Sequence, residues 1–197
     1  MIIGQKVTLL PFDEKWVETV RGWVNQPDVR SGTGAEGPVS DFEHRRWYEQ
    51  LMSDRGHRVF VIGQGHGMEA EPIGLIGLKH INERSRSAEY WIYVGSAAAR
   101  RKGLAEEATW LILDFGFDTL NLHTIYLAVL ETNTAALFLY KKLGFFHEGT
   151  TRDRLFRNGR FVSLLNYSMT EEEFRAHCPA CANETLSNAG DTCRPAR

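Results

Sequence analysis

The segment from residue 87 to residue 130 constrains the fold of this chain more than any other. It begins with the apolar strand pattern "SAEYWIYVG" (87–95), continues through "ARRKGLAEEA" (99–108), and ends with the alternating pattern "NLHTIYLAVL" (121–130). A strand, a glycine-containing loop, a helix and a second strand make a crossover unit, and such units are almost always right-handed. We therefore predict that these two strands form a parallel pair.

Further strand patterns lie on both sides of this unit. They are "KVTLLPF" (6–12), "HRVFVIGQ" (57–64), "PIGLIGLKHI" (72–81) and "GRFVSLLNYSM" (159–169). Consecutive strands that are joined by short turns pair antiparallel, so we expect an antiparallel run between residues 57 and 95. The fold class is therefore α/β, with a mixed sheet and helices on both of its faces.

Helical patterns begin at Asp13, after Ser40 and after Gly103, and a fourth ends at Gly144. Ser40 and Glu43 have the spacing of a capping box. The segment between the first two helices, residues 25–40, is predicted to be a loop because it is rich in residues that break regular structure. These residues are Pro27, Gly32, Gly34, Gly37 and Pro38.

Composition excludes several classes of protein. The chain has 197 residues, of which 43% are hydrophobic, and this suits one domain with a sizeable core. Its formal net charge of −2 does not favour nucleic-acid binding. No apolar run approaches the roughly 20 residues of a membrane-spanning helix, and "MIIGQKVTLL" lacks the pattern of a signal peptide. We expect no nucleic-acid partner and no membrane partner.

All three cysteines, Cys178, Cys181 and Cys193, lie near the C-terminal end of the sequence. A secreted domain built on disulfides distributes its cysteines through the fold, so we expect a reducing, cytoplasmic location. With His177 the cysteines form a conceivable set of soft-metal ligands, but their spacing matches no standard zinc module, and we expect no metal. We expect one domain over residues 1–175, followed by a tail over residues 176–197 that is flexible or weakly docked.

Three cations, Arg100, Arg101 and Lys102, stand where the helix of the crossover unit begins. Positive side chains oppose the positive end of the helix dipole, so this placement needs a compensating gain. The unpaired amide groups at a helix start bind anions, and Gly103 and Ala105 leave room for a phosphate to approach the backbone. We predict a phosphate site here; an ordinary helix start with solvated cations is the alternative.

Two motifs in this part of the chain resemble those of the GCN5-related N-acetyltransferase (GNAT) superfamily. "RRKGLA" (100–105) is similar to its Q/R-x-x-G-x-G/A pattern, and "NTAALFLYKKLGF" (133–145) resembles its N-x-x-A-x-x-x-Y-x-x-x-G-F segment. "RDRLFRNGRFVSLLNYSM" (152–169) resembles the C-terminal hairpin of the RimJ/RimL-type branch. The resemblance extends from about residue 5 to about residue 174.

This resemblance implies a GNAT-like mixed, mostly antiparallel sheet, in which the central parallel strand pair splays apart to admit acetyl-CoA as co-substrate. It implies that the pyrophosphate lies at the helix start and that the pantetheine arm pairs with the first crossover strand. A backbone amide near Tyr93 would hold the developing oxyanion. The residues implied in cofactor binding are Ile92, Tyr93, Val94, Arg100, Arg101, Lys102, Gly103, Leu104, Ala105, Asn133, Ala136 and Tyr140.

The resemblance also implies catalytic roles for three residues. Asn133 and Tyr140 are two helical turns apart, so they share a face with Ala136. Phenol and thiol pKa values of about 10 and about 8.5 are close enough for Tyr140 to protonate the leaving thiolate; a core tyrosine is the alternative. Asn133 binds the pantetheine or a water, and it also begins the helix as an N-cap. Glu89 is the candidate base for the acceptor amine, and a structural or solvated glutamate is the alternative.

The segment between the first two helices and the start of the second is expected to select the acceptor. Glu36, Asp41 and Glu43 carry charges that attract a cationic amine, as acids in this region do in polyamine acetyltransferases of the family. Arg45 and Arg46 leave a phosphorylated amino sugar or an acidic peptide open as well.

The resemblance to the GNAT superfamily implies acetyl-CoA-dependent transfer of an acetyl group to a primary amine of a small molecule. A polyamine, an amino sugar and an amino-containing antibiotic are the candidate acceptors. N-terminal acetylation of a protein such as a ribosomal protein is the alternative within this class. A non-catalytic module that binds acyl-CoA or an amine, and a nucleotide-binding α/β protein unrelated to CoA, are alternatives outside it. The sequence leaves a homodimer open.

Overall fold

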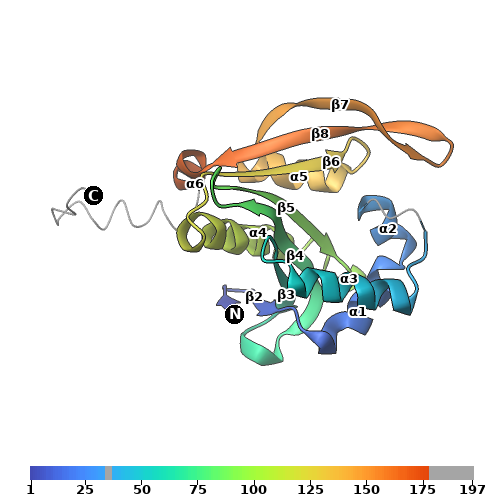
Figure 1. Ribbon diagram of the computed structural model, residues 1–197. Coiled ribbons are helices and arrows are strands. Elements are labelled where there is room, and N and C mark those ends of the chain that lie inside the picture. The colour runs from blue at the N-terminus through green and yellow to red at the C-terminus, as the bar shows by residue number, and fades with distance from the viewer. Residues whose placement is uncertain (34–36, 178–197) are drawn as a thin grey trace.

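An eight-stranded sheet runs through the computed structural model, which describes residues 1–33 and 37–177 (Figure 1). The strand order is β1-β2-β3-β4-β5-β6-β8-β7, and β5 and β6 are its one parallel pair of neighbours among the described residues. The parallel pair that the crossover pattern predicts is therefore confirmed. The strands are β1 (Ile2–Ile3), β2 (Val7–Pro11), β3 (Arg58–Gln64), β4 (Glu71–Asn82), β5 (Ser87–Val94), β6 (Thr124–Leu130), β7 (Phe146–Arg157) and β8 (Arg160–Thr170).

Helices connect these strands and cover the sheet (Figure 1). They are α1 (Val17–Val24), α2 (Pro27–Thr33), α3 (Asp41–Ser53), α4 (Leu104–Asp114), α5 (Thr134–Leu143) and α6 (Glu171–His177). Short 3-10 turns lie at η1 (Glu14–Trp16), η2 (Gly67–Glu69) and η3 (Ala97–Ala99), and α4 continues into a π-helical turn, η4 (Phe115–Thr119). Within the described residues, no helix is both long enough and apolar enough to cross a membrane.

Successive residues of the central strands point to opposite faces of the sheet and build two separate cores. Leu9 and Ile76 belong to a core that also contains residues of α4, α5 and α6. Their neighbours Leu10 and Leu75 belong to a second core that contains residues of α1 and α3. Burial of each such side chain contributes roughly 1.5–3 kcal/mol. Strands that are apolar on both faces therefore require the helices on both faces that the sequence predicts.

The parallel strands β5 and β6 pair over only part of their length. Residues 87–89 pair with residues 124–126. Beyond Glu89, β5 continues beside β4 as far as Val94, while β6 continues beside β8 as far as Leu130. Because β5 stays paired with β4 and β6 stays paired with β8 while the pairing between β5 and β6 stops, β5 and β6 diverge. The splayed central pair is confirmed.

Two local sequence signals are also confirmed. Ser40 and Glu43 form a capping box before α3, in which the Glu43 carboxylate accepts a hydrogen bond from the Ser40 amide at 2.9 Å. Gly144 ends α5 with a φ of 87°, a left-handed conformation that glycine adopts without a steric penalty.

The prediction of a loop throughout residues 25–40 is wrong, because α2 occupies Pro27–Thr33. Pro27 stands at the first position of the helix, where a backbone amide would lack an intrahelical partner in any case. Gly32 lies in the last turn, and one glycine in a helix costs only about 1 kcal/mol relative to alanine. The short strand β1 and the helix α6 are likewise elements that the sequence patterns did not predict.

Candidate active site

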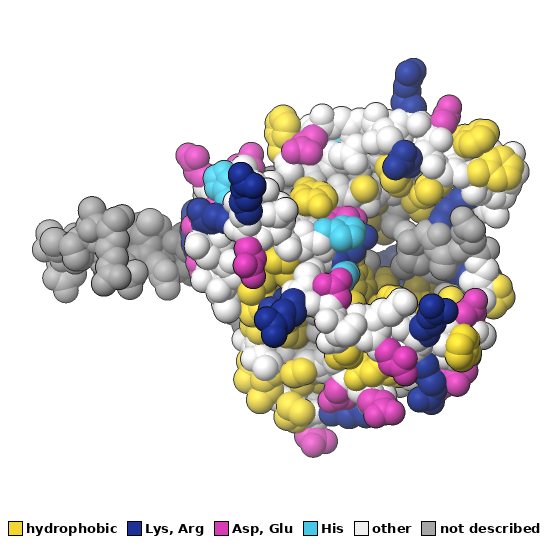
Figure 2. Space-filling model, viewed as in Figure 1, with side chains coloured by type: hydrophobic (Ala, Val, Ile, Leu, Met, Phe, Trp, Pro, Cys, Tyr) yellow, Lys and Arg dark blue, Asp and Glu magenta, His cyan; other side chains and the backbone are white. Residues whose placement is uncertain are grey.

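A cavity of about 670 Å³ opens where β5 and β6 diverge, and Figure 2 shows a hollow on this side of the molecule. Residues 89–93 of β5 and residues 128–130 of β6 line it. Because successive strand side chains point to opposite faces, a cavity lined by consecutive residues passes through the sheet. The cavity therefore connects the side of the sheet that α5 covers with the side that α1 and α3 cover. Its volume is within the usual range of small-molecule sites, about 300–1,000 Å³.

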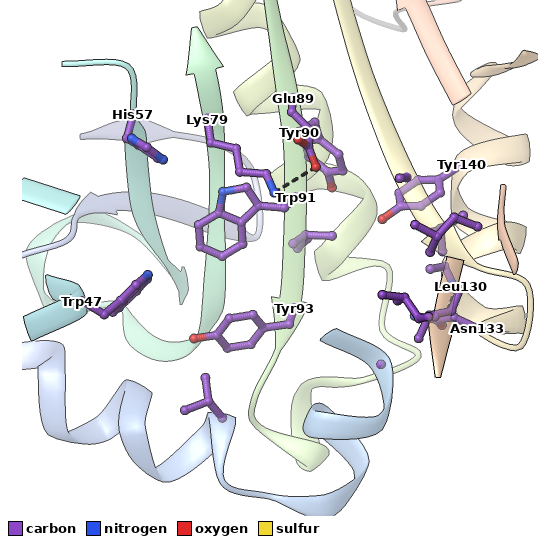
Figure 3. A pocket seen from close by; sticks show the side chains of 18 of the residues that line it. Trp47, His57, Lys79, Glu89, Tyr90, Trp91, Tyr93, Leu130, Asn133 and Tyr140 are labelled. Carbon is purple, nitrogen blue, oxygen red and sulfur yellow. Dashed lines mark hydrogen bonds and ion pairs between the residues drawn. The ribbon is translucent and has the colours of Figure 1, made fainter. Parts of the chain in front are cut away.

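Helix α5 and its N-cap contribute Asn133, Ala136 and Tyr140 to this cavity, so the three residues share a face. Figure 3 shows Asn133 and Tyr140 on this side of the cavity. Asn133 also caps the helix, since its Oδ1 accepts a hydrogen bond from the Ala136 amide at 3.2 Å. The capping interaction uses only the side-chain oxygen. The amide nitrogen of Asn133 makes no hydrogen bond with a described residue and is available to a ligand.

Tyr140 is 5% exposed, and its ring packs against the rings of Tyr90, Phe145 and Tyr167. Its hydroxyl points toward β5 (Figure 3) and makes no hydrogen bond with another described residue. Burial raises the pKa of Tyr140 above its ordinary value, because the phenolate is poorly solvated there. At neutral pH the side chain is therefore a protonated phenol, and its hydroxyl has no hydrogen-bond partner among the described residues.

Glu89 lines the cavity from β5, and Figure 3 shows its ion pair with Lys79. Both of its carboxylate oxygens have a partner. Its Oε1 lies 2.9 Å from Nζ of Lys79, which also lines the cavity. Its Oε2 lies 3.0 Å from Nδ1 of His80. The carboxylate is thus held in one orientation by two residues of β4.

The start of α4 has the geometry of an anion site. Gly103 is its N-cap, with φ 77° and ψ 2°, and Arg101 two residues earlier also has a positive φ of 62°. Backbone amides on either side of such left-handed residues converge and form concave sites for anions. A Cβ built at Gly103 meets no atom within 4 Å, so open space lies beside the backbone there. The residues from Arg101 to Ala105 therefore fit a ligand that carries phosphate groups.

Arg100 has protein partners of its own. Its Nη2 donates to the carbonyl oxygen of Val94 at 3.1 Å, and its Nη1 forms an ion pair with Asp28 of α2. The guanidinium therefore connects α2 with the end of β5. Arg101 and Lys102 make no such contacts with described residues and are exposed, so they are the cations available to a phosphate.

The other end of the cavity is aromatic. Trp47 of α3 and the β5 residues Trp91 and Tyr93 line it, and the rings of Trp91 and Tyr93 stack with centroids 6.1 Å apart (Figure 3). His44 also lines it and is only 3% exposed, and neither of its ring nitrogens has a hydrogen-bond partner among the described residues. Burial lowers the pKa of His44, which favours the neutral imidazole. This end thus offers flat apolar walls and a neutral histidine.

Two of the acidic residues that the sequence associates with the acceptor, Asp41 and Glu43, do not line the cavity. Asp41 is exposed and pairs with Arg45 at 3.1 Å. Glu43 is exposed and its carboxylate is engaged by Ser40 at 2.9 Å in the capping box. Glu36 lies outside the described residues, as do the cysteines at 178, 181 and 193.

Sequence reasoning missed several residues that the structure places in or beside the cavity, among them His44, Lys79, His80 and the side chain of Trp91. A signal existed for two of them. His44 is three residues before Trp47, so both lie on one face of α3. Trp91 is two residues after Glu89, so both point to the same face of β5. No comparable signal exists for His80.

Comparisons with known proteins agree with this geometry. Residues 6–146 match the acetyltransferase (GNAT) domain family. The chain is 34% identical over 173 residues to a spermidine N(1)-acetyltransferase of Escherichia coli, covering 88% of this chain and 90% of that protein. The crystal structure of a spermidine N-acetyltransferase from Vibrio cholerae, in complex with CoA and spermine, is similar with a TM-score of 0.80 and 29% identity, covering 87% of this chain and 99% of that one. The chain therefore belongs to the GNAT acetyltransferase family, and it is an N-acetyltransferase that uses acetyl-CoA as its co-substrate.

Proposed function

We propose that this enzyme acetylates the primary amine of a small alkylamine of the polyamine class. The observation that carries the proposal is the cavity through the splayed strands, which brings Tyr140, Asn133 and Glu89 to one space. The spermidine acetyltransferases to which the chain is similar support the acceptor class. We place the enzyme in the RimJ/RimL-type branch on the strength of its C-terminal hairpin pattern.

The CoA end of the site is proposed to lie between α4 and α5. Acetyl-CoA, when bound, supplies a thioester carbonyl to the cavity and phosphates to the start of α4. The backbone amides from Arg101 to Ala105, including Leu104, hold the phosphates, and Lys102 adds a mobile positive charge. Ile92 and Val94 offer their backbone to the pantetheine arm beside the divergence of β5 and β6. Asn133 donates from its side-chain amide, and Ala136 leaves the space that the arm needs.

Tyr140 is proposed to be the general acid that protonates the leaving thiolate. Burial raises the pKa of its phenol, so the proton is present at every physiological pH. The same surroundings disfavour a thiolate, so they raise the proton affinity of the departing sulfur as well. The difference in pKa between the phenol and the thiol therefore stays close to its value in water, where the pKa is about 10 for a phenol and about 8.5 for a thiol. A backbone amide near Tyr93 is proposed to stabilise the developing negative charge on the thioester oxygen.

Glu89 is proposed to be the base that receives the proton of the acceptor ammonium. An alkylamine has a pKa of about 10.4, so only about one molecule in a thousand is neutral near pH 7. Glu89 is the one carboxylate among the described residues that line the cavity. Lys79 and His80 each contact one of its oxygens, at 2.9 Å and 3.0 Å.

The aromatic end of the cavity is proposed to bind the remainder of the acceptor. Polyamines alternate short methylene segments with ammonium groups. Flat apolar walls bury the methylene segments, and an ammonium over the face of a tryptophan gains about 0.5–2 kcal/mol. Trp47, Trp91 and Tyr93 supply such faces. Glu36, which the sequence associates with the acceptor, stays a candidate for the distal ammonium, whereas the local pairing of Asp41 and Glu43 supports that role less.

The test is a measurement of CoA release from acetyl-CoA with spermidine, spermine, glucosamine, an aminoglycoside and a peptide with a free N-terminus. We expect kcat/KM for the polyamines to be at least about tenfold higher than kcat/KM for the other amines. Preference for the peptide would overturn the proposal in favour of protein acetylation. CoA binding without turnover of any amine would favour a non-catalytic module. If residues 1–175 form the catalytic domain, a variant truncated after residue 177 should retain full activity. The cytoplasmic location stays a prediction.

A further inference from the structure

Strand β4 contains one extra residue next to the proposed base. In its pairing with β5, Lys79 lies opposite Glu89 and Asn82 lies opposite Ser87, so two residues of β4 face only Ala88. His80 is the inserted residue: its φ of 53° is left-handed, while Ile81 returns to the core side of the strand. Such bulges bend a strand and redirect a side chain, and they are frequent beside active sites.

The bulge places two neighbouring side chains of β4 on one carboxylate. Consecutive residues of a regular strand point to opposite faces, so they cannot both contact the same cross-strand partner. Here Lys79 lies 2.9 Å from Oε1 of Glu89 and His80 lies 3.0 Å from Oε2. A left-handed backbone at a residue other than glycine costs about 1–2 kcal/mol, which is tolerated where the surrounding structure requires it.

We propose that His80 accepts the acceptor's proton from Glu89 and releases it to solvent. This inference rests on the proposed function and adds a second member to its base. The ammonium nitrogen gives its proton to a Glu89 oxygen, the Glu89 carboxyl gives a proton to Nδ1 of His80, and the imidazolium gives a proton to water. The neutral amine nitrogen is then free to attack the thioester. The exposed fractions of the two side chains agree with transfer of the proton outward from Glu89 to His80, since the Glu89 side chain is 21% exposed and that of His80 is 62% exposed.

Histidine suits this step better than a carboxylate alone. A general base is most effective when its pKa lies near the working pH, and the ordinary pKa of histidine is about 6.5 against about 4.3 for glutamate. Lys79 contacts Oε1 of Glu89, and His80 contacts the other oxygen, Oε2, as a second base.

The charged and titratable groups around His80 come from four parts of the fold. Glu89 of β5 and Lys79 of β4 are adjacent to it. His57, which precedes β3, has its ring 6.2 Å from that of His80 and pairs with Asp54 at 2.8 Å. Tyr126 of β6 lies beside Glu89 in the sheet. Figure 2 shows histidine side chains at the surface beside the hollow, where a proton can reach solvent.

The test uses His80→Gly, because glycine keeps the left-handed conformation of the bulge and leaves a space that imidazole can enter. His66→Gly is the control, since His66 is exposed at the opposite end of the β3–β4 pair. With spermidine near pH 7, kcat/KM of His80→Gly should fall by at least about tenfold. Added imidazole should restore it in proportion to the concentration of neutral imidazole. The deficit should shrink as the pH approaches about 10, where the amine is neutral without a base.

Imidazole should leave the wild type and His66→Gly unaffected. His80→Asn, which also tolerates a left-handed backbone, repeats the comparison in case the glycine variant is unstable. A deficit that is equal at every pH and insensitive to imidazole would reduce His80 to a positioning residue for Glu89. Activity within about twofold of wild type across the pH range would remove it from the reaction altogether. Both outcomes leave amine acetylation by the wild type intact, whereas an inactive wild type would refute the proposed function itself.

Discussion

Tyr140→Phe is the most informative single substitution in this enzyme. It removes one oxygen atom and keeps the ring that packs against Tyr90, Phe145 and Tyr167. No described residue hydrogen-bonds the Tyr140 hydroxyl, so the substitution leaves no buried partner unpaired in that part of the chain. The free energy of unfolding should therefore change by less than about 1 kcal/mol.

The catalytic effect should be much larger than the effect on stability. General acid catalysis contributes about 10²–10⁴ to a rate, which corresponds to about 3–5 kcal/mol of the activation free energy. The KM for acetyl-CoA should change far less, because the lost proton transfer belongs to the transition state. Burial raises the pKa of Tyr140, so the wild type should not lose kcat through deprotonation of this residue as the pH rises from about 7 to about 9.

The assay is steady-state turnover of wild type and Tyr140→Phe with two donors, acetyl-CoA and an acetyl thioester whose thiol is more acidic. A more acidic thiol leaves as a stable thiolate and needs less protonation, so the second donor should recover part of the lost kcat. If turnover of the variant stays within about threefold of wild type, or if both donors show the same deficit, Tyr140 is a core residue and solvent protonates the thiolate.

Three further predictions address the rest of the site. Gly103→Val should raise the Kd for CoA by at least about tenfold in calorimetry, because valine disfavours a φ of 77° and fills the space beside the backbone. Gly22→Ala, at an exposed position of α1 that has room for a Cβ, should leave the Kd unchanged. Trp47→Ala should raise the KM for spermidine by about 2- to 30-fold, whereas Phe42→Ala on the same helix, 73% exposed, should not; an equal rise in both would exclude a specific aromatic contact. The pKa of His44 is lowered in the folded protein, so the contribution of this residue to stability is present above about pH 6.5 and is lost as the pH falls below that value. The drop in Tm between about pH 8 and about pH 5 should therefore be smaller in His44→Leu than in wild type.

Sequence patterns predicted those parts of the fold that depend on local periodicity. The structure contains the strand–helix–strand unit of residues 87–130, the capping box at Ser40 and the helix end at Gly144. The helix α2 was missed because its stability comes from distant contacts rather than from its own residues. Arg100 pairs with Asp28 of α2, and Arg157 from the β7–β8 hairpin donates to a carbonyl near its end.

The candidate site was predictable where it follows helical spacing and not where it depends on a bulge. Asn133, Ala136 and Tyr140 lie on one face of α5 because of a periodicity that the sequence displays. His80 reaches Glu89 only because β4 has one residue more than β5 between two cross-strand pairs. Which residues of two strands lie opposite each other is decided when the sheet forms, and the sequence of β4 alone does not display it. Asp41 was assigned to the acceptor by charge alone, and its neighbour Arg45 neutralises that charge locally.

Two features offset the cost of placing three cations before the start of α4. Arg100 does not act on the helix dipole as a bare charge, since Asp28 and the Val94 carbonyl hold its guanidinium. The first turn of α4 carries Glu106 and Glu107, and negative charge at this end of a helix is favourable. Arg101 adopts a left-handed backbone that costs about 1–2 kcal/mol, and its side chain is exposed and has no hydrogen bond or ion pair with a described residue. A bound phosphate would repay that cost, because the conformation of Arg101 and Gly103 turns backbone amides toward one point beside open space.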